Sequence, residues 1–318
     1  MKALRFILIF AVFFGVVSCE KEIFPDLNQP FELVVIDAWL TDKPGPQQIF
    51  ITRSQPYFEN EFPEKVEGAI VQVISSDSVV YNFSENDSAY TWTAADSCSF
   101  VEVGQSYFLF VEVDGQQHSA FTTVGVVPEI DSVRYNFEEA IPNFIPEDHY
   151  LAEFYARDPE GLGNAYWIRG WKNGEPLSKP SEISIAFDAG GSPGAAVDGV
   201  QFIQPIRQSL NPFDQEEAGN LFNPPYLLGD SVYIEIHSIS AEAFFFLTEV
   251  ATQTNRAGGF AALFAQPVAN VSSNIFNLDQ NSTTKAVGYF NVAAVSSAGL
   301  RLSLAEAEDA RDRFETRP

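Results

Sequence analysis

The sequence predicts a mainly β protein in which an N-terminal β-sandwich precedes a second β-rich domain with one late helix. Two observations carry this prediction. Short β-branched and aromatic runs recur between turn residues along most of the chain, and one stretch after residue 240 has a helical apolar period. With 318 residues, of which 46% are hydrophobic, the chain can bury one large core or two ordinary ones.

Residues 1–18 are predicted to form a signal peptide. Lys2 and Arg5 precede an unbroken apolar run, Phe6–Val17, that ends at Ser18-Cys19. The run spans about a dozen residues, whereas a membrane-spanning helix needs roughly 20, which disfavours a transmembrane anchor. Val16–Cys19 is similar to a lipobox. This similarity implies acyl chains such as palmitate on Cys19, which would hold the mature protein on a membrane without crossing it.

Residues 19–30 are expected to form a lipidated tether, and the chain as a whole is strongly acidic. Its net charge is −25 at pH 7. Such a surface repels nucleic acid and anionic lipid, so we expect no nucleic-acid partner. Lipidation of Cys19 leaves Cys98 alone, which excludes an intramolecular disulfide. Stability must then come from the packed core.

Residues 31–127 are predicted to form the sandwich. Asp114-Gly115 lies between two apolar runs and predicts a tight hairpin. The succession of Glu67–Val73, a further strand and Val103–Leu109 is similar to the immunoglobulin-like sandwiches of carboxypeptidase-regulatory modules. The similarity implies an immunoglobulin-like β-sandwich. The strands are expected at residues 32–36, 48–52, 69–74, 78–83, 106–113 and 118–123.

Pro128–Val133 is interpreted as a domain boundary, and residues 128–304 as the second β-rich domain with long loops. Residues 173–231 are dense in Gly, Pro, Asn and Asp. Loops of this length are often functional, so a binding surface is expected there first. The strands of this domain are expected at residues 151–156, 165–171, 230–239 and 287–295.

The late helix is expected over residues 240–255. Ser240 can cap it, and its apolar residues recur at helical spacing on one face. These residues are Ala243, Phe246, Leu247 and Val250. Residues 305–318 follow as a polar C-terminal tail with helical propensity, which we expect to fray.

Several short motifs together resemble an uncharacterised lipoprotein family of Bacteroidota, domain of unknown function 4249. The motifs are Cys19–Ile23, Leu33–Pro46, Arg53–Phe58, Pro267–Ile275 and Gly288–Phe290. They span nearly the whole mature chain, although Pro267-Val268 departs from the paired prolines of that family. The resemblance implies an outer-membrane lipoprotein. Members are often encoded beside TonB-dependent transporters, which implies an accessory role in nutrient capture.

No motif for catalysis or for a cofactor stands out, so the sequence predicts binding and no enzyme activity. His118, His149 and His237 lie in separate segments without a second ligand at zinc spacing, and each is expected to be a surface or hydrogen-bonded residue. Trp167 and Trp171 would share one face of a strand. We assign that face to core packing, with ligand stacking as the alternative.

One turn offers a candidate metal site. Asp158, Glu160 and Asn164 are close enough in sequence to share a calcium ion, which prefers clustered oxygen ligands. A solvated hairpin turn is the alternative interpretation, and the spacing matches no known calcium loop.

The leading hypothesis is a lipid-anchored protein on the outer face of the outer membrane, which binds a ligand as an accessory subunit of a TonB-dependent transporter. Glu20–Glu22 looks like the charged export tag of surface lipoproteins, although a solvated tether would look the same. A structural or adhesive surface protein is the nearest alternative. A glycan-acting hydrolase with two facing carboxylates is the third.

Overall fold

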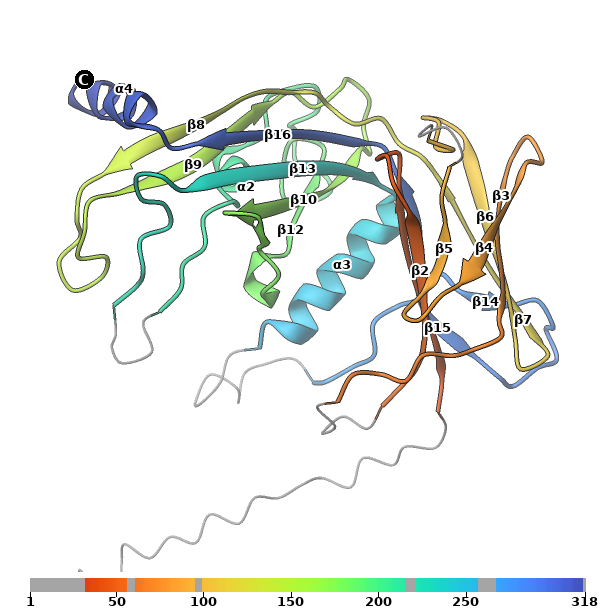
Figure 1. Ribbon diagram of the computed structural model, residues 1–318. Helices are drawn as coiled ribbons and strands as arrows, with labels where there is room; N and C mark the ends of the chain where they lie inside the picture. The colour runs from red at the N-terminus through yellow and green to blue at the C-terminus, as the bar shows by residue number, and fades with distance from the viewer. Residues whose placement is uncertain (1–31, 56–60, 95–98, 216–220, 257–266, 317–318) are drawn as a thin grey trace, which may run out of the picture. The chain divides into compact units, whose positions relative to one another are not determined.

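The computed structural model describes residues 32–55, 61–94, 99–215, 221–256 and 267–316. Strands dominate these residues, which confirms the mainly β class (Figure 1). The described residues of Leu33–Ser54 and Phe62–Pro318 form one compact unit, so the boundary expected at residue 128 is not confirmed. The predicted signal peptide, the predicted tether with Cys19, and Cys98 lie outside the described residues. Among those that are described, no helix is long and apolar enough to cross a membrane.

The larger sheet has nine strands in the order β14-β7-β6-β3-β4-β5-β2-β1-β15. It curls back on itself, because β15 at one end also contacts β7 near the other, as in a sandwich or a nearly closed barrel. Ile36, Leu40 and Val73 are among the side chains that it buries completely. Its strands are β1 (Val34–Thr41), β2 (Gln47–Arg53), β3 (Ile70–Ser75), β4 (Val80–Glu85), β5 (Tyr90–Trp92), β6 (Ser106–Val113), β7 (Gln116–Thr123), β14 (Phe276–Asn277) and β15 (Ala286–Ala293).

Two strands of this sheet come from the expected second domain. β15 runs parallel to β1 along the whole of both strands, from Val34 opposite Ala286 to Thr41 opposite Ala293, and β14 pairs with β7. The sandwich is therefore completed by the C-terminal part of the chain. A division of the sequence at residue 128 separates strands that the fold joins.

The parallel pair of β1 and β15 depends on a glycine. Gly288 has a φ of 116°, in the left-handed region that other residues rarely adopt. A Cβ atom at this position would lie 2.0 Å from the carbonyl oxygen of Ile36. Glycine is thus the residue that allows β1 and β15 to approach each other here.

The second sheet has the order β11-β10-β13-β16, and β12 pairs with the other half of β10. A separate hairpin of two strands shares a second hydrophobic core with this sheet. Its first strand begins inside the expected boundary segment, which is therefore part of the core structure. The strands are β10 (Ala165–Lys172), β11 (Glu175–Pro176), β12 (Ser184–Phe187), β13 (Ser231–Ile239) and β16 (Val295–Arg301), with β8 (Ile130–Glu138) and β9 (His149–Ala156) in the hairpin.

The expected late helix is present as α3 (Ala241–Thr254), where the Ser240 hydroxyl accepts a hydrogen bond from the Ala243 amide at 3.1 Å. It buries Phe244 and Leu247 in a third apolar cluster. Two short elements, the 3-10 helix η1 (Pro180–Glu182) and α2 (Gln204–Arg207), lie in the predicted loop region.

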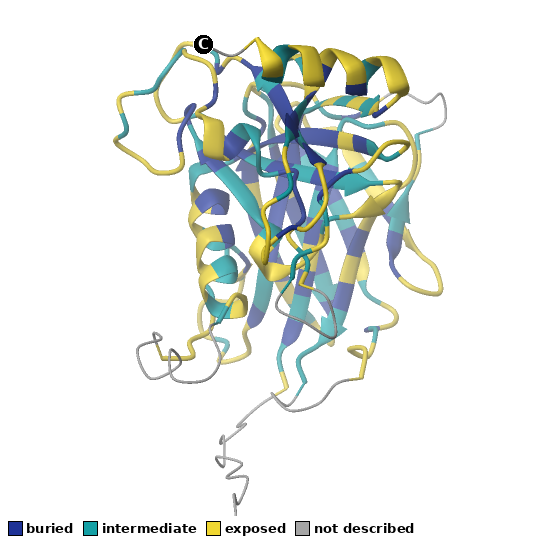
Figure 2. Ribbon diagram, turned by 90° about the vertical axis from the view of Figure 1, so that its left-hand side faces the viewer, coloured by how far each residue is buried: buried dark blue, intermediate teal, exposed yellow. Residues whose placement is uncertain are grey.

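The polar tail is a folded helix, α4 (Leu304–Glu315), which corrects the expected fraying end. Ser303 caps it by accepting from the Glu306 amide at 3.3 Å. Ala307 and Ala310 are buried, and the Phe314 ring meets that of Phe137 at 5.2 Å. Figure 2 shows that α3 and α4 each expose one side and bury the other. Two small residues on the inner face therefore dock a helix that is otherwise charged.

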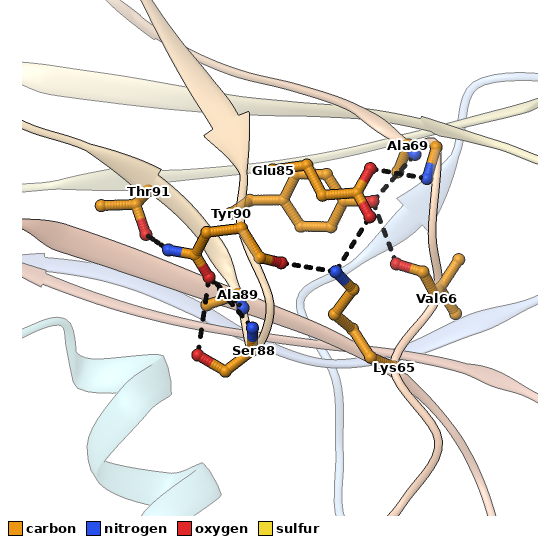
Figure 3. Close-up of polar contacts among 10 residues, drawn as sticks. Lys65, Val66, Ala69, Glu85, Ser88, Ala89, Tyr90 and Thr91 are labelled. Carbon is orange, nitrogen blue, oxygen red and sulfur yellow. Dashed lines mark hydrogen bonds and ion pairs between the residues drawn. The ribbon is translucent and has the colours of Figure 1, made fainter.

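Tyr90 ties a loop to the end of the larger sheet (Figure 3). Its fully buried hydroxyl donates to the Val66 carbonyl at 3.0 Å and accepts from the Ala69 amide at 2.9 Å. Lys65 pairs with Glu85 at 2.9 Å, and Glu85 also accepts from the Gly68 amide. These contacts hold residues 65–69 against the β4–β5 hairpin.

We expect Tyr90→Phe to lower the free energy of unfolding by roughly 1–3 kcal/mol, because it leaves two main-chain groups without their partner. Chemical denaturation measures the loss, and hydrogen exchange at the Ala69 amide should accelerate. Tyr81→Phe is the control, since Tyr81 is only partly buried and water can replace its hydroxyl. Equal stability of the two variants would contradict the prediction.

Candidate ligand-binding pocket

A pocket of about 770 Å³ lies between the β1–β2–β15 part of the larger sheet and β10 of the second sheet. We call it the intersheet pocket. Residues of α3 line one side of it, and the segment around η1 lines another. Pockets that bind small molecules have volumes of roughly 300–1,000 Å³ and mostly apolar walls. The apolar lining outside the aromatic residues includes Leu33, Val35, Leu177, Ile183, Leu247, Val250, Val271 and Val287.

Aromatic rings from four separate elements of the chain form one wall. Trp39 of β1 meets Trp167 of β10 edge to face, with 5.1 Å between ring centroids, and stacks on Tyr289 of β15 at 5.5 Å. Phe246 of α3 stacks on Tyr289 at 4.4 Å. The rings fix one another by packing, and all four also line the pocket. Such a wall is suited to an apolar or flat ligand.

Trp167 and Trp171 do share one face of β10, as predicted, but that face lines the intersheet pocket and is not closed core. Arg169 lies between them on the same face because side chains of a strand alternate. Its guanidinium carbon is 4.7 Å from the Trp167 ring and 5.3 Å from the Trp171 ring. Sequence reasoning missed Arg169, although a cation between two tryptophans at strand spacing was a visible signal.

One carboxylate, Asp37, lines the pocket from β1. Solvent in the pocket can reach it, yet protein surrounds it, and this burial raises its pKa although a contact with Trp39 acts in the opposite direction. The other two charged lining residues are already engaged. Lys179 forms an ion pair with Asp214, and Glu182 accepts a hydrogen bond from the Lys179 amide at 2.8 Å.

A buried carboxylate, Glu235 of β13, lies directly opposite Arg169 in the strand register. Its oxygens accept from Lys43, from the Tyr233 hydroxyl at 3.1 Å and from His237 at 2.8 Å. Burial would raise its pKa, but the hydrogen bonds from His237 and Lys43 outweigh burial and lower the pKa to about 2. Glu235 is thus a fixed negative charge behind the pocket wall.

The three histidines do not meet, and all are buried. His237 contacts Glu235, and His149 contacts the Glu147 carbonyl at 3.0 Å through Nδ1. His118 has no hydrogen-bond partner for either ring nitrogen among the residues described. The expectation of surface or hydrogen-bonded residues is therefore wrong for His118. Burial lowers its pKa, so the ring stays neutral.

The carboxylates that lie together at the turn proposed as a calcium site are not the ones that the sequence predicted. Asp158 lies with Asp188 and Asp198, each offering one oxygen within 4.8 Å of the others, and Glu160 is not part of this group. The side-chain nitrogen of Asn164 donates to two carbonyls of the turn. Three carboxylates this close could hold a calcium ion. Asp188 and Asp198 were missed because they follow Asp158 by 30 or more residues in the printed sequence.

Backbone and hydroxyl donors already hold these carboxylates in place. Asp158 accepts from the Tyr166 hydroxyl at 2.6 Å, and Asp188 accepts from the Gly163 amide at 2.8 Å. Burial raises the pKa of Asp158, and the charges of its two neighbours act in the same direction. The cluster therefore also serves to fix the turn before β10.

Comparison with known proteins places the chain in a family. No curated protein matches it. A family described as "Domain of unknown function (DUF4249)" matches residues 20–298, which include the larger sheet, the second sheet except the last three residues of β16, and every residue of the intersheet pocket. Because this match covers most of the chain, the protein belongs to the domain of unknown function family DUF4249.

Proposed function

We propose that the protein is an exported binding protein that holds an apolar small molecule in the intersheet pocket. The observation that carries the proposal is the pocket itself, with a volume of about 770 Å³ and a wall of four mutually packed aromatic rings. The described lining offers few charged groups, and two of them, Lys179 and Glu182, already have partners. Such a site can bind and release a ligand without changing it.

We further propose that acyl chains on Cys19 anchor the protein to the outer membrane, on its outer face, where it serves a TonB-dependent transporter. The support for the anchor is the lipobox-like Val16–Cys19. The support for the transporter is the resemblance of the chain to a family whose members are often encoded beside TonB-dependent transporters. Cys19→Ala is expected to release the protein from membranes, and the wild type is expected to co-purify with a β-barrel transporter in mild detergent.

The binding proposal is tested with N-phenyl-1-naphthylamine, a neutral probe that fluoresces in apolar sites. Val35 lines the pocket from β1, and Val35→Trp places a large ring inside it. We expect this variant to lose at least about tenfold in probe affinity, because the ring occupies volume that the probe needs. The measurement is a fluorescence titration of the folded mature protein.

Val80→Trp is the matched control, since Val80 is 46% exposed on β4 and does not line the pocket. It is expected to bind the probe like the wild type. If Val35→Trp also binds like the wild type while keeping its melting temperature, the pocket is not the binding site. A structural or adhesive role then becomes the better hypothesis.

A further inference from the structure

Arg169 is a cation for which the described part of the chain offers no anionic partner. Its guanidinium lies over Trp167 and Trp171 and forms no ion pair or side-chain hydrogen bond with any residue that the structure describes. It does line the intersheet pocket. Burial lowers the pKa of Arg169, because removing the charged guanidinium from water is unfavourable when no direct partner compensates for it.

The nearest carboxylate in the strand register cannot take this role. Glu235 lies opposite Arg169, but Lys43, Tyr233 and His237 already occupy both of its oxygens. Glu235 stabilises the charge of Arg169 at longer range, while no side chain among the described residues accepts a hydrogen bond from the guanidinium. The planar guanidinium can therefore offer two parallel N–H groups to an anion inside the pocket.

We infer that the intersheet pocket selects amphipathic monoanions, whose carboxylate, sulfonate or phosphoester group binds Arg169 and whose apolar body lies on the wall of Trp39, Tyr289 and Phe246. This inference rests on the proposed function and adds the class of ligand. The two tryptophans beside Arg169 exclude water from the ion pair, which strengthens it. Lys179, the other cation of the described lining, is paired with Asp214 and adds no second anion site.

Asp37 restricts the ligand to a single anionic group. It lines the same pocket, and it forms no ion pair with Arg169. A second carboxylate on the ligand would enter a pocket that already holds one, and like charges in an apolar site repel. Dodecanoate is therefore expected to compete for the pocket better than dodecanedioate or dodecanol, and Asp37→Asn is expected to weaken the discrimination against dodecanedioate.

The test uses two probes with the same apolar body. N-phenyl-1-naphthylamine is neutral, and 8-anilinonaphthalene-1-sulfonate carries one sulfonate in addition. We expect the wild-type protein to bind the sulfonate probe more tightly. Arg169→Met keeps an aliphatic stem and removes the charge, so it is expected to weaken binding of the sulfonate probe roughly tenfold to a hundredfold and to weaken binding of the neutral probe far less.

Arg134→Met is the matched control, because Arg134 also lies over a ring, that of Tyr155 at 5.2 Å, but outside the pocket. It should change neither affinity. Arg169→Lys keeps a charge with poorer geometry and should fall between the wild type and Arg169→Met. It also decides the question if Arg169→Met does not fold, since a sulfonate affinity equal to that of the wild type would then overturn the inference.

The outcomes separate the inference from the proposed function. In one outcome, Val35→Trp abolishes binding of the neutral probe, but neither Arg169 variant changes the affinity for the sulfonate probe. The pocket is then a binding site, and its proposed selectivity for anions is overturned. Failure of the wild type to bind either probe overturns both.

Discussion

Gly288→Ala is expected to lower the free energy of unfolding by more than about 4 kcal/mol, so that little folded protein is recovered. The new Cβ would lie 2.0 Å from the Ile36 carbonyl oxygen and 2.7 Å from the carbonyl carbon. Both atoms belong to the backbone of a buried parallel pair, so no flexible side chain can move aside. The φ of 116° adds a conformational cost for any residue with a Cβ. Circular dichroism and thermal unfolding measure the result.

Gly125→Ala provides the comparison for this substitution. A Cβ at Gly125 would meet the Cβ of Ser238 at 3.6 Å, an ordinary contact, and this glycine has no positive φ. Its melting temperature should stay close to that of the wild type. A Gly288→Ala protein that melts near the wild type would show that β1 and β15 do not approach each other in this register.

Glu235 is expected to make a large, pH-dependent contribution to the free energy of unfolding. Its pKa falls from the model-peptide value of 4.5 to about 2 on folding. The unfolded chain therefore binds more protons than the folded one between these pH values, and stability rises with pH across the window. The contribution is fully present above pH about 4.5, and about 3 kcal/mol is lost as the pH falls to about 2.

His237 also makes the folded protein less stable as the pH falls, but at higher pH values than Glu235. Burial lowers its pKa below 6.5, and Glu235 only partly opposes this. Because the folded form holds a neutral ring, its Nε2–H donates to Glu235. Protonation of the unfolded chain below pH about 6.5 therefore also favours unfolding.

Glu235→Gln is expected to lose roughly 3–5 kcal/mol at pH 7, because it leaves the Lys43 ammonium without its carboxylate and disturbs a buried network. The difference between wild type and variant should shrink between pH 4.5 and 2, and urea unfolding at several pH values measures it. Lys43→Met is a milder control, since Lys43 is 42% exposed. A constant difference across this pH range would contradict the role assigned to Glu235.

The sequence was informative where structure is local. Asp114-Gly115 predicted the β6–β7 hairpin because both residues tolerate the positive φ that such a turn requires. Ser240 and the apolar period behind it predicted α3. β16 was missed because Ser296, Ser297 and Gly299 have low β propensity, and the strand forms only by pairing with β13. The helical propensity of the C-terminal tail was recognised, but the packing of α4 against the core was not, because its buried face consists of alanines in a mostly polar sequence.

The candidate site could be predicted only in part, because it is assembled from distant segments. Trp167 and Trp171 were placed on one face correctly from strand alternation alone. Nothing local relates them to Trp39 or Tyr289, which arrive through the β1–β15 pairing. Of residues 173–231, where a binding surface was expected, the segment from Pro176 to Ile183 lines one edge of the pocket.

The parallel pairing of β1 with β15 also determines when the protein can fold. β1 is the first strand described, and its partner β15 is synthesised after nearly all the rest of the chain. A contact of such long sequence separation closes a large loop, and folds rich in such contacts form slowly. The edge of β1 that pairs with β15 therefore stays unpaired until the C-terminal part of the chain has been made. A chain that ends before Ala286 leaves that edge uncovered and cannot complete the larger sheet, so assembly waits for the C-terminus.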